Sequence, residues 1–216
     1  MKIKHPINFH KGLTFPIVLA LMVLYHNFTI GAWVYLTLHS TYGFLWLIKD
    51  SIFPDKKWEQ EIPTVQGIIT FFLLGLYWIA PFILISSGTV PPLPLVAAAI
   101  SLNIVGVFLH FTSDAQKYYT LKYKTGLITE GFFARCRNTN YLGEVLIYLA
   151  FAMLAQHWLP FLILGLFIAM VFVPNMNKKD KSLSRYPEFE EYKERSGLLF
   201  PKLLISRNIQ EEETTA

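Results

Sequence analysis

The stretch from Asp114 to Glu144, DAQKYYTLKYKTGLITEGFFARCRNTNYLGE, is polar and basic and separates two strongly apolar segments. Residues 93–111 before it, and most of the chain after Tyr141, are apolar over the roughly 20 residues that a helix needs to cross a bilayer. The stretch therefore predicts a membrane protein in which Asp114, Asn140 and Glu144 lie at the boundary between lipid and water. An ionisable group costs roughly 2.5–3.5 kcal/mol at the centre of a membrane helix, so its presence near lipid indicates a function.

The composition of the 216 residues is that of a membrane protein. Hydrophobic residues make up 53% of the chain and charged residues 16%, whereas about a quarter of the residues of a soluble domain are charged. Short loops leave room for one membrane domain, residues 1–216, and for no separate soluble domain. The single cysteine, Cys136, excludes an internal disulfide and a cysteine-based metal cluster, and no metal site is expected.

Apolar runs define the expected membrane spans. Backbone groups in lipid must be hydrogen-bonded within the protein, so these runs are expected to form helices. The sequence therefore predicts an all-α integral membrane protein with about six transmembrane helices. The six runs are residues 13–25, 28–48, 65–86, 93–112, 141–155 and 158–174.

The basic residues of the loops predict the orientation. The turns 26–29, 87–94 and 156–158 contain no Lys or Arg. Lys and Arg gather instead in the N-terminus and in three further segments, 49–57, 117–137 and 178–185. Because basic residues collect on the cytoplasmic side, six spans place every basic segment and both termini there. This rule also accounts for the net charge of +4 without a nucleic-acid partner. We expect a multi-pass protein of the bacterial inner membrane, or of the endoplasmic reticulum in a eukaryote, in contact with membrane lipids.

The unusual polar residues gather on this predicted cytoplasmic side. His110 and Asp114 are four residues apart and share one helix face, as do Asn140 and Glu144. Carboxylates and amides bind ribose hydroxyls, and basic side chains bind phosphates. A pocket lined by both types, with apolar helices above it, suits a polar cofactor and a lipid-like substrate.

A structural explanation of the same residues stays open. Asp114 can instead pair with Lys117, and Glu144 with Arg137, while the basic segment 178–185 can contact anionic lipids.

His39 and Tyr42 are the catalytic candidates in the second apolar run. They lie in YLTLHSTYGFLW, residues 35–46. A histidine in an apolar helix either forms a hydrogen bond in the core or lines a substrate cavity, where a tyrosine can donate a proton.

The run CRNTNYLGE, from Cys136 to Glu144, resembles the Asn-aromatic-x-Gly-Glu motif of the steroid 5-alpha-reductase C-terminal family. That family groups with sterol reductases, enoyl reductases of fatty acid elongation and a bacterial branch of membrane proteins. The segment SDAQKYYTLKYKTGLITEGFF and the tail SLSRYPEFEEYKERSGLLFP also resemble family elements, so the likeness covers about residues 100–201.

The resemblance implies a membrane oxidoreductase that uses NADPH to reduce a C=C bond in a steroid, sterol or enoyl substrate. Residues 1–92 would form the substrate side and 93–201 the cofactor-binding half, followed by a disordered tail, 202–216. The expected cofactor-binding residues are His110, Asp114, Gln116, Arg137, Asn140, Tyr141, Glu144, Lys179 and Tyr186.

Departures from the family pattern keep two alternatives open. Where steroid reductases carry an Arg-x-x-x-His-x-x-x-Tyr pattern, this chain has Val171, Asn175 and Lys179. Residues 137–141, RNTNY, also resemble the Arg-His-Pro-x-Tyr motif of isoprenylcysteine carboxyl methyltransferases, which implies S-adenosylmethionine as the alternative cofactor. A non-enzymatic membrane protein is the third possibility, and the oligomeric state is open.

Overall fold

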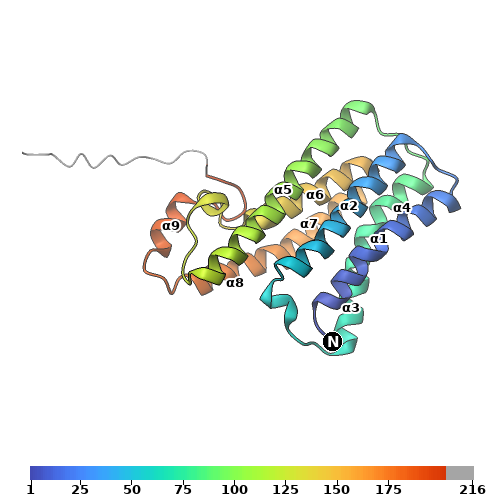
Figure 1. Ribbon diagram of the computed structural model, residues 1–216. Coiled ribbons are helices and arrows are strands. Elements are labelled where there is room, and N and C mark those ends of the chain that lie inside the picture. Colours follow the sequence, from blue (N-terminus) through green and yellow to red (C-terminus); the bar gives the residue numbers. More distant parts are fainter. Residues whose placement is uncertain (203–216) are drawn as a thin grey trace, which may run out of the picture.

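The computed structural model describes residues 1–202, and these residues form helices and no strand (Figure 1). The tail predicted to be disordered lies, from residue 203 onward, outside the described residues. The longer helices are α1 (Lys4–Leu24), α2 (Ile30–Ile52), α3 (Thr64–Gly75), α4 (Ile79–Ser86), α5 (Leu93–Tyr123), α6 (Thr139–Ala155), α7 (Trp158–Phe167), α8 (Val173–Leu183) and α9 (Phe189–Arg195). Short helical turns complete the order, namely η1 (Lys56–Glu59), η2 (Leu76–Trp78), η3 (Gly131–Phe133) and η4 (Ile168–Phe172). The all-α prediction is therefore confirmed.

Apart from residues 25, 28 and 29, each of the six predicted apolar runs lies in one helix or in a continuous series of helical segments. Among the described residues, four stretches are long and apolar enough to cross a membrane. They are Lys4–Leu24, Thr64–Ser86, Leu93–Tyr123 and Trp158–Leu183. Helix α6 is apolar but shorter. These four stretches support a membrane protein, while the count of six spans and the cytoplasmic placement of the termini stay predictions.

Two of the membrane-length stretches change their helical geometry beside a proline. In the third run, the tight turn η2 joins α3 to α4 just before Pro81, whose missing N–H cannot bond the carbonyl of Tyr77. In the last run, the wider turn η4 precedes Pro174 in the same way. The prolines thus account for both interruptions.

Small residues bring α5 and α6 into close contact. A Cβ atom added to Gly106 would lie 2.7 Å from the carbonyl oxygen of Gly143, and one added to Gly143 would lie 2.5 Å from the backbone nitrogen of His110. Such glycine contacts let membrane helices approach backbone to backbone. As a result, the polar residues at the ends of the two helices face one another.

The turns and the charged segments lie at opposite ends of the bundle. Figure 1 shows the turns 25–29 and 87–92 at one end, and α8, α9 and the loop before α6 at the other. We call the second end, which also carries residues 53–63, the polar end. The N-terminus ties residues 53–63 in place, since Lys2 and Lys4 both pair with Glu59.

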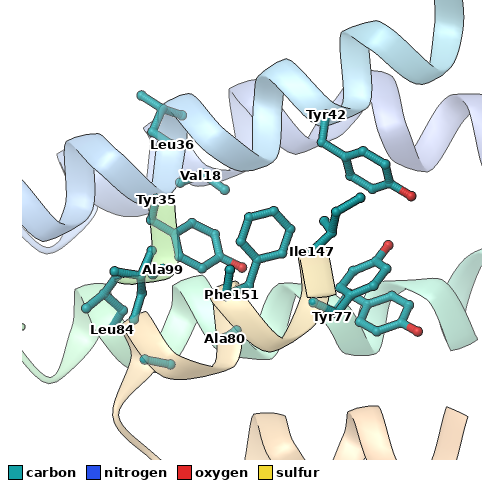
Figure 2. Packing of buried hydrophobic residues seen from close by; sticks show 14 of the residues in the cluster. Val18, Tyr35, Leu36, Tyr42, Tyr77, Ala80, Leu84, Ala99, Ile147 and Phe151 are labelled. Atoms are coloured by element: carbon teal, nitrogen blue, oxygen red, sulfur yellow. The ribbon is translucent and has the colours of Figure 1, made fainter. Parts of the chain in front are cut away.

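Aromatic residues fill the centre of the bundle. Tyr35 of α2 faces Phe151 of α6, with ring centroids 5.2 Å apart, and Tyr42 projects from α2 toward the side of the core where Tyr77 lies (Figure 2). Tyr35, Tyr42 and Phe151 are among the largest fully buried side chains of this core, and Tyr77 and Tyr148 are also buried there, so several phenol groups lie inside the predicted membrane region.

Candidate functional site

A buried ion pair anchors the polar end of the bundle. Lys49 of α2 and Asp114 of α5 approach to 3.0 Å, and their side chains are only 3% and 9% exposed. The other carboxylate oxygen of Asp114 accepts a hydrogen bond from the side-chain amide of Asn140 at 3.2 Å. His110 Nδ1 lies 2.9 Å from the carbonyl oxygen of Asn140. Three of the nine predicted cofactor-binding residues, His110, Asp114 and Asn140, therefore form one network, completed by Lys49 of α2.

Two buried polar atoms of this network have no hydrogen-bond partner among the described residues. Within residues 1–202, neither His110 Nε2 nor the side-chain oxygen of Asn140 has a partner, and both atoms are buried. A buried polar group without a partner costs about 1–3 kcal/mol. Such groups are typical of sites that complete their hydrogen bonds with a ligand or with water.

A cavity of about 500 Å³ lies in front of the Lys49–Asp114 pair. Its size falls in the usual range for small-molecule sites. Its walls come from the end of α2, the segment after it and the end of α5. The lining residues are Lys49, Phe53, Pro54, Asp55, Lys56, Asp114, Lys117, Tyr118, Leu121 and Lys122. We call it the basic pocket, because four lysines and two aspartates leave it a net charge of +2.

A second ion pair crosses the basic pocket. Lys117 lies 2.9 Å from Asp55, and both side chains are partly exposed. Burial alone would raise the pKa of Asp55, but the Lys117 ammonium and the backbone N–H of Lys57 outweigh burial and hold this pKa below its ordinary value. Asp55 is therefore ionised at neutral pH and neutralises Lys117.

A smaller cavity of about 200 Å³ lies beside the basic pocket and shares Lys117 and Leu121 with it. Arg137 and Lys179, both expected to bind the cofactor, lie on its wall. Both, however, hold the C-terminal segment. The Nε and Nη2 atoms of Arg137 both lie 3.0 Å from Oδ2 of Asp180, and Lys179 donates to the carbonyl oxygen of Arg137 at 2.6 Å.

The pairings that the structural explanation suggested are wrong. Asp114 pairs with Lys49 rather than Lys117, and Lys117 pairs with Asp55. Arg137 pairs with Asp180 rather than Glu144. Glu144 is instead close enough to the buried Lys11 for the two side chains to interact electrostatically.

Three other predicted cofactor residues lie away from both cavities. Gln116 binds the loop before α6 through the carbonyl oxygen of Glu130 and the N–H of Phe132. Tyr141 packs against Phe172, with ring centroids 5.0 Å apart. Tyr186 accepts a hydrogen bond from its neighbour in the chain at 3.1 Å. None of the three lines the basic pocket or the smaller cavity.

The predicted catalytic residues lie deeper in the bundle and outside both linings. His39 is fully buried, stacks on Phe151 at 4.3 Å and has its Nδ1 atom 3.2 Å from the hydroxyl of Tyr35. Its Nε2 atom has no partner within the described residues. Tyr42 is also fully buried, and its ring lies 6.1 Å from that of His110. The structure thus puts Tyr42 directly inward of the polar network.

The sequence did not reveal Lys11, which is the most unusual residue beside Tyr42. This lysine of α1 is only 3% exposed, and its Nζ atom donates to the hydroxyl of Tyr148 at 2.8 Å. The same atom lies 4.0 Å from the centre of the Tyr42 ring, a cation–π geometry. The signal that would have found it is Pro6, which marks the first turn of a helix and places Lys11 well inside α1.

Comparison with known proteins identifies a family. The family model described as protein of unknown function (DUF1295) matches residues 51–196, which is more than half of the chain. No curated protein matches, and no solved structure does. The match includes most of the basic pocket and the polar network, but it begins after α1 and Lys11.

Proposed function

The chain belongs to DUF1295, a family associated with steroid 5-alpha-reductase-like proteins, and we propose that it is an NADPH-dependent membrane reductase. Its substrate would be a lipid-like molecule with a C=C bond conjugated to a carbonyl group. The observation that supports this function best is the basic pocket, which combines a net positive charge with the buried carboxylate of Asp114 on its wall.

The residues present fit a phosphorylated dinucleotide. The lysines of the basic pocket would hold phosphates, since charge-assisted hydrogen bonds to phosphate are among the strongest in proteins. Asp114, which lines the pocket, would bind hydroxyl or amide groups, and Asn140 holds this carboxylate in place through a hydrogen bond from its side-chain amide. NADPH would supply a hydride to the substrate.

The charge of the pocket also separates the two enzymatic alternatives. S-adenosylmethionine carries a positive sulfonium group, whereas NADPH is strongly negative. A pocket with a net charge of +2 attracts NADPH and repels the sulfonium group of S-adenosylmethionine. The methyltransferase is therefore the weaker candidate.

Lys11 and Tyr148 are suited to assist the reaction from inside the membrane. When a conjugated C=C bond is reduced, negative charge builds up on the carbonyl oxygen, and a well-placed hydrogen-bond donor stabilises it. The amine of Lys11 donates to the oxygen of Tyr148, which strengthens the hydroxyl of Tyr148 as a donor. Tyr42, the predicted proton donor, lies against the same amine.

A small gap lies beside Tyr77 and Tyr148. It lies between η2, α4, α6 and α7 and has a volume of about 10 Å³, room for about one water molecule. In our proposal, a lipid-like substrate reaches Tyr148 from the side of the bundle, which requires α4 and α7 to move apart at this gap.

Nucleotide binding tests this proposal without knowledge of the substrate. The full chain, purified in mild detergent, is titrated with NADPH and with S-adenosylmethionine. We expect NADPH to bind, and Asn140→Ala to weaken this binding about tenfold, the loss of roughly one hydrogen bond to a charged group. Glu130→Gln, which changes an exposed acid outside both cavities, is the matched control and should bind like the wild type.

The other outcomes decide between the alternatives. Binding of S-adenosylmethionine alone would replace the reductase by a methyltransferase. Binding of neither ligand would leave the non-enzymatic membrane protein as the better explanation.

A further inference from the structure

Two of the four lysines of the basic pocket form ion pairs with aspartates, and the other two do not. Lys49 is neutralised by Asp114 at 3.0 Å, and Lys117 by Asp55 at 2.9 Å. Lys56, at the start of η1, forms no ion pair within residues 1–202, and neither does Lys122, near the end of α5. The net charge of +2 is therefore carried by two lysines on two different walls of one cavity.

Two aromatic side chains line the same cavity as Lys56 and Lys122. Phe53 and Tyr118 both line the basic pocket, and their ring centroids lie 6.4 Å apart. Nucleobases stack on such rings, whichever base they are. The pocket thus offers an aromatic wall and two uncompensated positive charges, while the buried Asp114 lies on its inner side.

We propose that Lys56 and Lys122 bind the 2′-phosphate of an adenosine ribose, with the adenine against Phe53 and Tyr118. This inference rests on the proposed function and deepens it, because it assigns the adenosine end of NADPH to the outer part of the basic pocket. A phosphate monoester carries a charge of about −1.5 to −2 at neutral pH, which matches two free lysines. NADH lacks this phosphate, so these lysines would make the site selective for NADPH.

The experiment compares two nucleotides that differ only in this phosphate. The full chain, in nanodiscs of phosphatidylcholine, is titrated with NADPH, NADH and adenosine 2′,5′-bisphosphate. The variants are Lys56→Met and Lys122→Met, which keep the length of the side chain and remove its charge. Lys124→Met is the control, because Lys124 is an exposed lysine just after α5 that does not line the pocket.

We expect the wild type to bind NADPH at least ten times more tightly than NADH. Each pocket variant should lose about tenfold in affinity for NADPH and for the bisphosphate, and less than twofold for NADH. The control should match the wild type for all three ligands.

Three results would overturn the inference, and they are distinguishable from one another. If the pocket variants weaken NADH as much as NADPH, the lysines do not read the 2′-phosphate, although the pocket still binds the cofactor. If phosphatidylglycerol in the nanodiscs abolishes the difference between wild type and variants, the lysines hold the phosphate of a lipid headgroup instead. If the wild type binds neither dinucleotide, the proposed function fails together with the inference.

Discussion

Loss of the Lys49 charge should destabilise the protein far more than loss of the neighbouring Lys117 charge. Both lysines line the basic pocket and both pair with an aspartate, at 3.0 and 2.9 Å. They differ in exposure, since the Lys49 side chain is 3% exposed and the Lys117 side chain 36%. Removing one partner of a buried pair costs roughly 3–5 kcal/mol, whereas an exposed pair contributes roughly 0.2–1 kcal/mol.

The substitutions Lys49→Met and Lys117→Met make this comparison with the same chemical change. One kcal/mol corresponds to roughly 2–4 °C in the melting temperature of a chain of this length. We therefore expect Lys49→Met to lower the melting temperature by roughly 6–20 °C and Lys117→Met by at most about 4 °C. Thermal unfolding in one detergent at pH 7, followed by circular dichroism, measures both shifts.

A third variant tests the cause of the larger shift. Lys49→Met combined with Asp114→Asn removes the uncompensated carboxylate and keeps the contact with Asn140, so it should recover most of the lost stability. Equal small shifts for the two single variants would refute the reasoning, because they would show that water reaches the Lys49–Asp114 pair.

The close contact between α5 and α6 gives a further prediction. Gly143→Ala should lower stability by roughly 1–3 kcal/mol, because the new Cβ would meet the backbone of His110 at 2.5 Å. Gly165→Ala, where the Cβ meets open space, should have no such effect in the same unfolding assay. The lowered pKa of Asp55 predicts that its pair with Lys117 stabilises the protein at neutral pH and stops doing so as the pH falls below about 4. Melting temperatures of wild type and Asp55→Asn should therefore differ at pH 7 and converge in acid, and a constant difference would contradict the assignment.

The helices were predictable because lipid leaves the backbone few choices. Every apolar run became helical, as the need to satisfy backbone groups requires. The ends of the helices were less predictable. Helix α1 begins at Lys4 instead of residue 13, α2 continues to Ile52 instead of 48, and α5 continues to Tyr123 instead of 112. Hydropathy marks where a helix contacts lipid, but a helix can continue into water or into a polar interior.

These longer helices explain which part of the site the sequence could not supply. The four-residue spacing along one helix predicted that His110 and Asp114 share a face, and the motif at the start of α6 predicted that Asn140 lies on the same side of the membrane. The structure brings all three residues into contact. Lys49, which completes the network, had been assigned to a loop because the second run was expected to end at residue 48. The pairing of α2 with α5 depends on packing between distant segments, which no local pattern in one sequence specifies.

Lys11 was expected in the N-terminal segment outside the membrane, because the first apolar run begins at residue 13, and its observed position bears on whether the protein is an enzyme. A lysine that served only the positive-inside rule would extend into water, whereas Lys11 is buried against Tyr42 and Tyr148. A methionine in the same place would avoid the cost of burying an amine. The protein therefore retains a costly group between two phenols, close to the polar network and to the carboxylate of Glu144. This buried amine is one reason to prefer the proposed reductase over the non-enzymatic alternative, because a reductase has to stabilise negative charge on a buried carbonyl oxygen.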